Sequence, residues 1–538
     1  MSVLGRQSLG DGGPLSIAVV GSGIAGLYCA HRLALRGHRV SVFEQLPQVG
    51  GRIETLNIAG IDCECGPMRF ELALQPMLTR LAGELGIQFS PFTPARGEPV
   101  HSTTYTLEAD EMPREGTAVS LDLLKLGIYR ILHCPDARPE NDSTLDERIK
   151  REDAARWTFA DVIEARDAAG QNAMQRYADS LDDKDYDHIR TRHTLGGRKL
   201  YTMGLWNALD YVLSAGAVAK IREVGTFYHL IPENPSASEW SIFWLRLFGT
   251  ASDLSTIEGP GGVSQIVTRL LAQITALGAT VEITPNAMVV EIGPAAHKDR
   301  VRLTIDFQEP GQVLDLEFDH VILALPRQPL SKLTRYFPPD VRRYVDGVNG
   351  FPLLKAFAIL KTPWWGDTMP HAQKGAHLVP TREVHYKESP DKVGMVLFYT
   401  DRPAIAYWTP YVQVPHLGAQ RGGPPELRRE LAAQLLALKT DKETGPQERY
   451  KSDIDAMEAS IVDFAIRDWS KPPFGAASHA WLPGINVPEA MERLKAFNLL
   501  GQPGRGNIHV CGEAYSDYQG FIEGSLRSAS KTLAAIKD

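Results

Sequence analysis

A glycine-rich turn near the start of the chain constrains the fold more than any other feature of the sequence. Residues 17–20 form an apolar run typical of a buried parallel strand, and residues 27–34 carry apolar side chains at helical spacing. Between them, Gly21, Gly23 and Gly26 stand in G-x-G-x-x-G spacing. Gly21 allows a tight turn, Gly23 allows the close approach of a pyrophosphate to the backbone, and Gly26 allows close packing of the helix on the strand.

The residues after this turn complete a dinucleotide-binding unit. Residues 38–44 form a second predicted strand, which ends in Glu44, 18 residues after Gly26. An acid at this place accepts hydrogen bonds from an adenosine ribose. The helix start offers unpaired N–H groups and a positive dipole end to the phosphates. The sequence therefore predicts dinucleotide binding, and the alternative is a glycine-rich turn in an unrelated α/β unit.

A second glycine-rich element indicates which dinucleotide is bound. Gly50, Gly51 and Arg52 follow shortly after Glu44, where a nicotinamide dehydrogenase has no need of them. The segment resembles that of glutathione-reductase-like flavoproteins, in which the arginine neutralises the FAD pyrophosphate. The alternative is a surface turn with a solvated arginine. Near the other end, residues 508–511 form a predicted buried strand, followed by Gly-Glu, a loop and an amphipathic helix.

Composition excludes several classes of function. The chain has 538 residues, 43% hydrophobic and 23% charged, which indicates a globular protein of several domains. A net charge of -8 argues against a nucleic-acid binder. Five scattered cysteines do not form a disulfide framework, and we find neither a signal-peptide core nor an apolar run of about 18 residues. We therefore expect a cytoplasmic protein with no nucleic-acid or membrane partner.

The pair Cys63-x-Cys65 raises the question of a metal site. The two side chains point to the same face of a predicted strand. A zinc site needs about four ligands, and no second cluster of Cys and His accompanies this pair. We predict structural thiols and no metal.

These blocks together resemble the FAD-dependent amine oxidase superfamily, most closely its branch of L-amino acid oxidases and related lysine and tryptophan 2-monooxygenases. The resemblance runs through nearly the whole chain, in residues 17–70, "EGPGGVSQIVTRLLAQITALGATVEI", "DHVILALPRQPL", "FPLLKAFAIL", "SHAWLPG" and the C-terminal motif. It implies an α/β fold with a discontinuous, glutathione-reductase-like Rossmann FAD-binding domain, a mixed β-rich substrate domain and a helical insertion. The implied segments are 1–66, 255–330 and 491–538 for the FAD-binding domain, 67–120 and 331–490 for the substrate-binding domain, and 121–254 for the helical domain.

The resemblance also implies a set of residues that contact FAD. Val281 and Ile283 resemble a strand whose backbone contacts adenine, and Gly520-Phe521-Ile522 resembles the segment that passes the isoalloxazine. The implied cofactor-binding residues are Gly21, Gly23, Ile24, Ala25, Gly26, Glu44, Gln45, Gly50, Gly51, Arg52, Met68, Arg69, Val281, Ile283, Gly512, Glu513, Gly520, Phe521 and Ile522.

Arg69 in "GPMRF" is the residue that points to a substrate. The segment resembles the L-amino acid oxidase motif whose arginine binds the substrate carboxylate, and a planar guanidinium suits that task because it makes two parallel charge-assisted hydrogen bonds. The alternative is an arginine that holds FAD or an internal acid. In "LVPTREVHYKES", either His385 or Tyr386 faces inward by strand alternation, and we expect Tyr386 to be a second carboxylate anchor.

Three further side chains are assigned by the resemblance. Lys355, among apolar residues on a predicted strand, would hold a water near flavin N5; the alternative is an edge lysine that reaches solvent. Trp481 and Phe521 would line the substrate pocket on opposite sides. Ordinary core packing is the alternative for Trp481.

The predicted activity is that of an FAD-dependent L-amino acid oxidase. Such an enzyme converts an L-α-amino acid and O2 to a 2-oxo acid, ammonia and hydrogen peroxide, and the branch is often dimeric. Three alternatives stay open at this point: an L-amino acid 2-monooxygenase that forms an amide, a primary-amine or polyamine oxidase, and a non-enzymatic flavoprotein.

Overall fold

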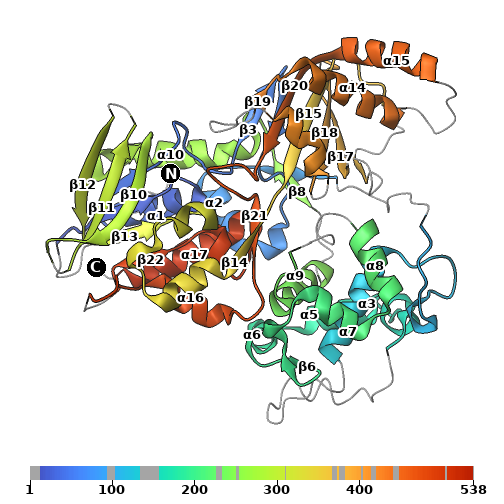
Figure 1. Ribbon diagram of the computed structural model, residues 1–538, viewed down its shortest axis with the longest axis horizontal. Helices are drawn as coiled ribbons and strands as arrows, with labels where there is room; N and C mark the ends of the chain where they lie inside the picture. The colour runs from blue at the N-terminus through green and yellow to red at the C-terminus, as the bar shows by residue number, and fades with distance from the viewer. Residues whose placement is uncertain are drawn as a thin grey trace.

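The computed structural model describes most of the chain (Figure 1). The described residues are 13–93, 103–133, 157–225, 233–249, 254–297, 299–308, 311–365, 372–374, 382–389, 391–401, 404–412, 420–439, 447–502 and 506–536. Cys134 lies outside them. Within this part of the chain, no helix is both long enough and apolar enough to cross a bilayer.

A five-stranded parallel sheet is built from pieces of chain that lie far apart in the sequence. Its order is β22-β13-β1-β2-β9, and Val19 of β1 pairs with Ile322 on one side and with Val42 on the other. All three side chains are fully buried, as expected for apolar runs in a sheet covered on both faces. The strands are Ser16–Val20 (β1), Arg39–Phe43 (β2), Val281–Thr284 (β9), His320–Leu323 (β13) and Ile508–Val510 (β22).

Helices cover one face of this sheet and a second sheet covers the other. On the first face, α1 packs against α10 and α17, and α1 and α17 share a core with β1. On the second face lies an antiparallel sheet of order β10-β11-β12. The bounds are Ile24–Leu35 (α1), Gln265–Ala276 (α10), Ile522–Ala535 (α17), Ala287–Pro294 (β10), Val301–Phe307 (β11) and Gln312–Phe318 (β12). The predicted discontinuous Rossmann fold is confirmed, whereas the boundaries of the six segments stay a prediction.

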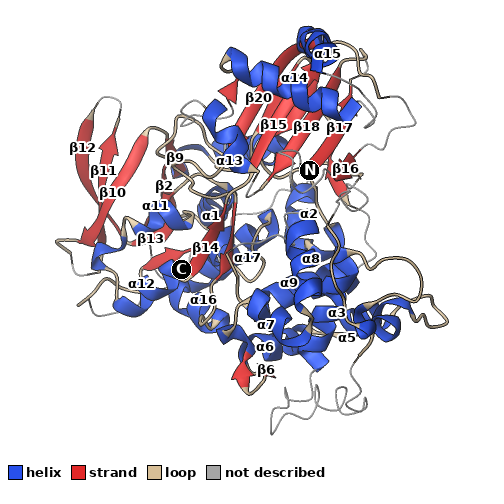
Figure 2. Cartoon of the chain, turned by 45° about the vertical axis from the view of Figure 1, so that its right-hand side comes forward, coloured by secondary structure: helices blue, strands red, loops and turns tan. Residues whose placement is uncertain are grey.

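A six-stranded antiparallel sheet forms the second body of the molecule. Its order is β16-β17-β18-β15-β20-β19, and the helices α14 and α15 pack over one face (Figure 2). The strands are Ala372–Lys374 (β16), Glu383–Glu388 (β17), Gly394–Thr400 (β18), Leu354–Leu360 (β15), Ile461–Asp468 (β20) and Gln420–Arg421 (β19), and the helices are Pro425–Lys439 (α14) and Gln447–Ser460 (α15). This is the predicted mixed, β-rich body.

A helical body stands apart from both sheets (Figures 1 and 2). Trp206, Trp240 and Trp244 lie in its apolar core. Asp182 caps the start of α6 by accepting hydrogen bonds from the backbone N–H groups of Lys184 and Asp185. The helices are Ser120–His133 (α3), Ala173–Ser180 (α5), Asp183–Thr191 (α6), Leu205–Val212 (α7), Ala215–Val224 (α8) and Ala237–Gly249 (α9).

Short elements join the three bodies. The hairpin β3–β4 packs against the six-stranded sheet through Cys63 and Cys65, and β14 pairs with β21 beside the C-terminal segment. These and the other short elements are Thr55–Ile58 (β3), Ile61–Glu64 (β4), Pro76–Glu84 (α2), Phe89–Pro91 (β5), Thr194–Leu195 (β6), Arg198–Lys199 (β7), Ser255–Ile257 (β8), Arg327–Ser331 (α11), Pro339–Asp346 (α12), Val348–Phe351 (β14), Ile405–Trp408 (α13), Ser478–Trp481 (β21) and Val487–Lys495 (α16).

Candidate active site

One cavity runs from the glycine turn after β1 to the six-stranded sheet and helix α9. It brings together residues from three parts of the chain that the sequence separates by hundreds of positions. The sequence-predicted residues that line it are Gly21, Gly23, Ile24, Ala25, Glu44, Gln45, Gly50, Gly51, Arg52, Met68, Arg69, Lys355, Gly512, Glu513, Gly520, Phe521 and Ile522.

The glycine turn has the shape that a dinucleotide needs. A Cβ on Gly26 would lie 2.0 Å from the carbonyl oxygen of Gly21, so the helix packs on the turn too closely for any side chain. At Gly23, the N-cap of α1, a Cβ would meet no atom within 4 Å, which leaves the space in front of the helix open. An open space before unpaired N–H groups, with Arg52 on the same cavity, fits a pyrophosphate.

Glu44 occupies the place expected of a ribose-binding acid. Its Oε2 accepts hydrogen bonds from the backbone N–H of Ser22 at 2.9 Å and from the Ser22 hydroxyl at 2.8 Å. Its Oε1 accepts from the backbone N–H of Leu46 at 3.0 Å. These contacts hold the carboxylate beside the turn at the carboxyl end of β2, where it lines the cavity.

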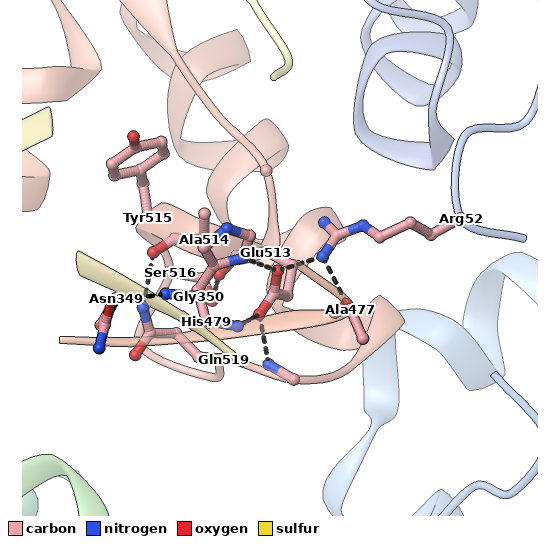
Figure 3. A network of polar contacts seen from close by, with 12 residues as sticks. Arg52, Asn349, Gly350, Ala477, His479, Glu513, Ala514, Tyr515, Ser516 and Gln519 are labelled. Atoms are coloured by element: carbon pink, nitrogen blue, oxygen red, sulfur yellow. Dashed lines mark hydrogen bonds and ion pairs between the residues drawn. The ribbon is translucent and has the colours of Figure 1, made fainter. Parts of the chain in front are cut away.

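A buried carboxylate lies where the C-terminal segment meets the cavity (Figure 3). Glu513 Oε1 accepts hydrogen bonds from the backbone N–H groups of His479 and Gly520, both at 2.8 Å. Its Oε2 accepts from His479 Nδ1 at 2.9 Å and from Arg52 Nη1 at 3.0 Å. Burial alone would raise the pKa of Glu513, but the neighbouring His479, the Arg52 charge and these bonds lower it to about 2. This carboxylate therefore stays ionised and fixed.

A row of polar side chains crosses the six-stranded sheet on the face toward the cavity. The register places Glu383 of β17 opposite Tyr399, Tyr399 opposite Lys355, and Lys355 opposite Arg467 of β20. Strand alternation then places Asp401 on the same face, and Lys355, Tyr399 and Asp401 all line the cavity.

Lys355 is 2% exposed and is held by backbone oxygens. Its Nζ donates hydrogen bonds to the carbonyl of Glu64 at 2.8 Å and to that of Gly66 at 2.6 Å, and it lies 4.7 Å from the centre of the Tyr399 ring. Burial lowers the pKa of this ammonium to about 8. The lysine does not reach bulk solvent, so the edge-lysine alternative is wrong.

Arg69 lines the cavity and is held by a buried acid of β17. Its Nη1 lies 3.0 Å from Oε2 of Glu383 and 3.4 Å from Oε1. Glu383 does not line the cavity, and its Oε2 also lies 3.3 Å from Nε2 of His385. Burial opposes the charge on Glu383, but Arg69 and the His385 hydrogen bond lower the pKa of Glu383 to about 2. The guanidinium is thus positioned by a permanent counter-ion.

Comparison with protein families identifies the family of the chain that forms this cavity. The sequence pattern of the family described as flavin containing amine oxidoreductase matches residues 24–536. The chain belongs to the flavin-containing amine oxidoreductase family. FAD is its cofactor, and the glycine turn, Glu44 and Arg52 are the groups of the described residues that suit its dinucleotide part.

Proteins similar to this chain carry several different names. Aplysianin-A from Aplysia kurodai is 22% identical over 558 residues, which cover 96% of this chain and 89% of that protein. An L-amino-acid oxidase from Demansia vestigiata is 23% identical, over 72% of this chain and 66% of its own. The solved structure of putrescine oxidase bound to putrescine superposes with a TM-score of 0.61 at 19% identity, covering 98% of this chain and 99% of that one. At that identity the likeness shows the fold alone.

Two predicted substrate contacts of this amine oxidoreductase require correction. Tyr386 lies on the other face of β17 from Glu383, in an apolar core with its ring 5.0 Å from that of Trp365, and it does not line the cavity. Trp481 is fully buried, donates from Nε1 to the carbonyl of Ser516 at 2.9 Å, and does not line the cavity either. Tyr386 therefore faces away from the site, and Trp481 is enclosed by core packing.

Three predicted cofactor contacts also lie outside the cavity lining. Gly26 packs against the turn, as described above, and so acts through helix packing. Val281 and Ile283 lie on β9 at the edge of the parallel sheet, paired with Val40 and Val42, and their contact with adenine stays a prediction.

The structure shows site residues that the sequence did not predict. Trp240 and Phe243 of α9 stack at 4.7 Å, and Phe243 lies 6.0 Å from Phe521. Trp240 also contacts Phe351 at 5.8 Å, edge to face. These four rings line the cavity as a continuous aromatic wall. The spacing of three residues between Trp240 and Phe243 is the signal that could have found the pair, because it places both rings on one helix face.

The cysteines behave as structural thiols. Cys63 and Cys65 are fully buried, and burial raises the pKa of both, that of Cys63 to about 12. Among the residues that the structure describes, no group of three or more His, Cys, Asp or Glu side chains could hold a metal ion.

Proposed function

We propose that this amine oxidoreductase is an FAD-dependent L-amino acid oxidase, which converts an L-α-amino acid and O2 to a 2-oxo acid, ammonia and hydrogen peroxide. The observation that carries the proposal is the position of Arg69. Arg69 lines the same cavity as the predicted FAD-binding residues, and Glu383 holds its guanidinium from outside that cavity. A guanidinium fixed in this way suits a substrate carboxylate, because orientation is settled before the substrate binds.

Each remaining group has a role in this proposal. Bound FAD supplies the two-electron oxidation of the substrate C–N bond. Arg69 binds the carboxylate and orients the α-carbon, while the aromatic wall of Trp240, Phe243, Phe351 and Phe521 buries the side chain and excludes water. Burial in the cavity favours the neutral amine over the ammonium. Lys355, fixed by two carbonyls, holds a water for imine hydrolysis, as the family resemblance implies.

The experiment compares two substrates that differ only in the carboxylate. L-phenylalanine and 2-phenylethylamine share a side chain, so the ratio of their kcat/KM values reports the carboxylate contact. We expect Arg69→Ala to raise KM for L-phenylalanine about a hundredfold and to leave the amine unchanged, since a charge-assisted bidentate contact is worth up to about 3 kcal/mol. Arg69→Lys should restore only part of the loss, because lysine cannot make the planar fork. The flavin spectrum of each variant checks that FAD is still bound.

A primary-amine oxidase is the second candidate. It is favoured by the position of Tyr386, which leaves Arg69 without the predicted second carboxylate anchor. Turnover of 2-phenylethylamine with no oxidation of any free L-amino acid would establish this candidate and refute ours.

The two remaining alternatives need other measurements. Release of amide and carbon dioxide in place of ammonia and peroxide would identify a 2-monooxygenase. Failure of every amino acid and amine to bleach the flavin anaerobically would indicate a non-enzymatic flavoprotein. Cytoplasmic location and a dimeric state stay predictions of the sequence, to be checked by localisation and by light scattering.

A further inference from the structure

His479 presents one ring nitrogen to the cavity. Its Nδ1 lies 2.9 Å from Oε2 of Glu513, and its backbone N–H donates to Oε1 of the same carboxylate at 2.8 Å (Figure 3). Among the described residues, none makes a hydrogen bond with Nε2. Nε2 is also absent from the fully buried polar atoms that lack a partner, so the protein does not enclose it completely. Since His479 is 1% exposed and lines the cavity, Nε2 is the ring nitrogen that reaches the cavity.

The chemistry of this nitrogen follows from its neighbours. Glu513 is ionised and accepts hydrogen bonds only, so the imidazole must carry its hydrogen on Nδ1. Burial lowers the pKa of His479 in spite of the adjacent Glu513, which favours the neutral ring. In a neutral ring with the hydrogen on Nδ1, Nε2 is a hydrogen-bond acceptor. The cavity therefore contains a fixed, neutral acceptor among its lining groups.

The neighbours also indicate which ligand this acceptor meets. The same carboxylate, Glu513, binds His479, Arg52 and the backbone N–H of Gly520. Arg52 lines the cavity together with the glycine turn that suits the pyrophosphate, and Gly520 precedes the aromatic wall at Phe521. His479 thus lies between the part of the cavity suited to phosphates and the part suited to an aromatic ring.

We propose that His479 Nε2 accepts a hydrogen bond from bound FAD, either from N3–H of the isoalloxazine or from a ribityl hydroxyl. Glu513 then acts through His479, because it fixes the tautomer and the ring orientation that make Nε2 an acceptor. Glu513 is a positioning residue and His479 is the FAD contact. This contact involves FAD and not the amino-acid substrate. It can therefore be tested separately from the proposed oxidase activity.

The test uses His479→Asn in the holoenzyme. The asparagine amide can still donate to Glu513 from the place of Nδ1, but it puts no acceptor at the place of Nε2. We expect FAD to dissociate about tenfold more readily, which is the effect of one net hydrogen bond. Release is followed by the rise of flavin fluorescence on dilution. His320→Asn is the matched control, because His320 donates from Nδ1 to His509 at 2.9 Å outside the cavity lining, and its FAD affinity should be unchanged.

Wild-type protein loaded with altered FAD identifies the donor and needs no variant that might misfold. If the donor is N3–H, N3-methyl-FAD should bind the wild type about tenfold more weakly, and His479→Asn should cause no further loss with this analogue. If the donor is a ribityl hydroxyl, FAD lacking the 2′-, 3′- or 4′-hydroxyl should show that pattern instead. Wild-type affinity of every analogue, or unchanged FAD release from His479→Asn, would overturn the proposal.

Discussion

At the scale of single residues, the site depends on buried charges that are neutralised in place. Arg69 pairs with Glu383 and Arg52 pairs with Glu513; both arginines line the cavity, and each carboxylate side chain is 5% exposed. A buried pair contributes little to stability by itself, but loss of one partner leaves an uncompensated charge. These pairs therefore serve to keep two guanidinium groups in fixed positions for anionic ligands.

Glu383→Gln should allow the Arg69 guanidinium to move, but FAD should stay bound. Glutamine retains an acceptor oxygen but not the charge, so we expect KM for the amino acid to rise about tenfold, with FAD affinity unchanged. Glu388→Gln is the control, since Glu388 ends the same strand and pairs with the exposed Lys392. Steady-state kinetics with flavin titration checks this. A loss of FAD in place of a rise in KM would assign Glu383 to the cofactor.

The same variant has a defined pH dependence. Because the pKa of Glu383 is lowered from 4.5 to about 2, its stabilising effect is complete above about pH 4.5 and is lost as the pH falls through 2. That effect is on the order of 3 kcal/mol at pH 7. Glu383→Gln should therefore melt well below the wild type at pH 7, and the gap should narrow at pH 3. An equal gap at both pH values would contradict this.

Sequence spacing placed in the cavity those residues whose positions are set locally. Gly21 and Gly23 lie in the turn after β1 and Glu44 follows β2, and all three line the cavity, while their contacts with FAD stay a prediction. The prediction for Tyr386 was wrong because the strand face that meets the site depends on the neighbouring strands, and that for Trp481 was wrong because core packing encloses the ring. The register that places Glu383 beside Tyr399 and Lys355 joins the consecutive strands β17 and β18 to the earlier strand β15, and no local pattern encodes the pairing with β15.

At the scale of secondary-structure elements, two glycines at the start of helix α1 have different tasks. Gly26 allows the helix to pack on the turn, and Gly23 leaves space for a bound phosphate. Gly26→Ala should destabilise the protein even without FAD, because its Cβ would clash with the Gly21 carbonyl at 2.0 Å. Gly23→Ala should leave the FAD-free protein stable, because a Cβ there meets no atom within 4 Å, but it should weaken FAD binding at least tenfold by filling the cradle.

Melting of the FAD-free proteins and flavin titration separate these two effects. Gly13→Ala is a suitable control, since a Cβ at Gly13 also meets nothing within 4 Å and the residue lies before β1. Normal FAD affinity in Gly23→Ala would contradict the placement of the pyrophosphate at the start of α1.

At the scale of the whole molecule, residues from all three bodies line the cavity. The parallel sheet supplies Glu44, the six-stranded sheet supplies Lys355, and the helical body supplies Trp240. A ligand bound there contacts all three, so it should stabilise the complete assembly and not one part of it.

Removal of FAD should therefore lower the melting temperature of every body. Excess FAD at about a hundred times its Kd stabilises the native state by about 2.7 kcal/mol relative to the FAD-free protein. Hydrogen exchange should show faster opening in β1, β15 and α9 alike once FAD is removed. Protection confined to the parallel sheet would indicate that the other two bodies do not depend on the cofactor.

The parallel sheet has a consequence for how the protein is made. Its strands β1, β13 and β22 come from the beginning, the middle and the end of the described chain, and Glu513 follows the last of them. A ribosome must therefore translate beyond residue 513 before Arg52 meets its counter-ion. Purified products that terminate before residue 513 should therefore be colourless, whereas the purified full-length protein should be yellow.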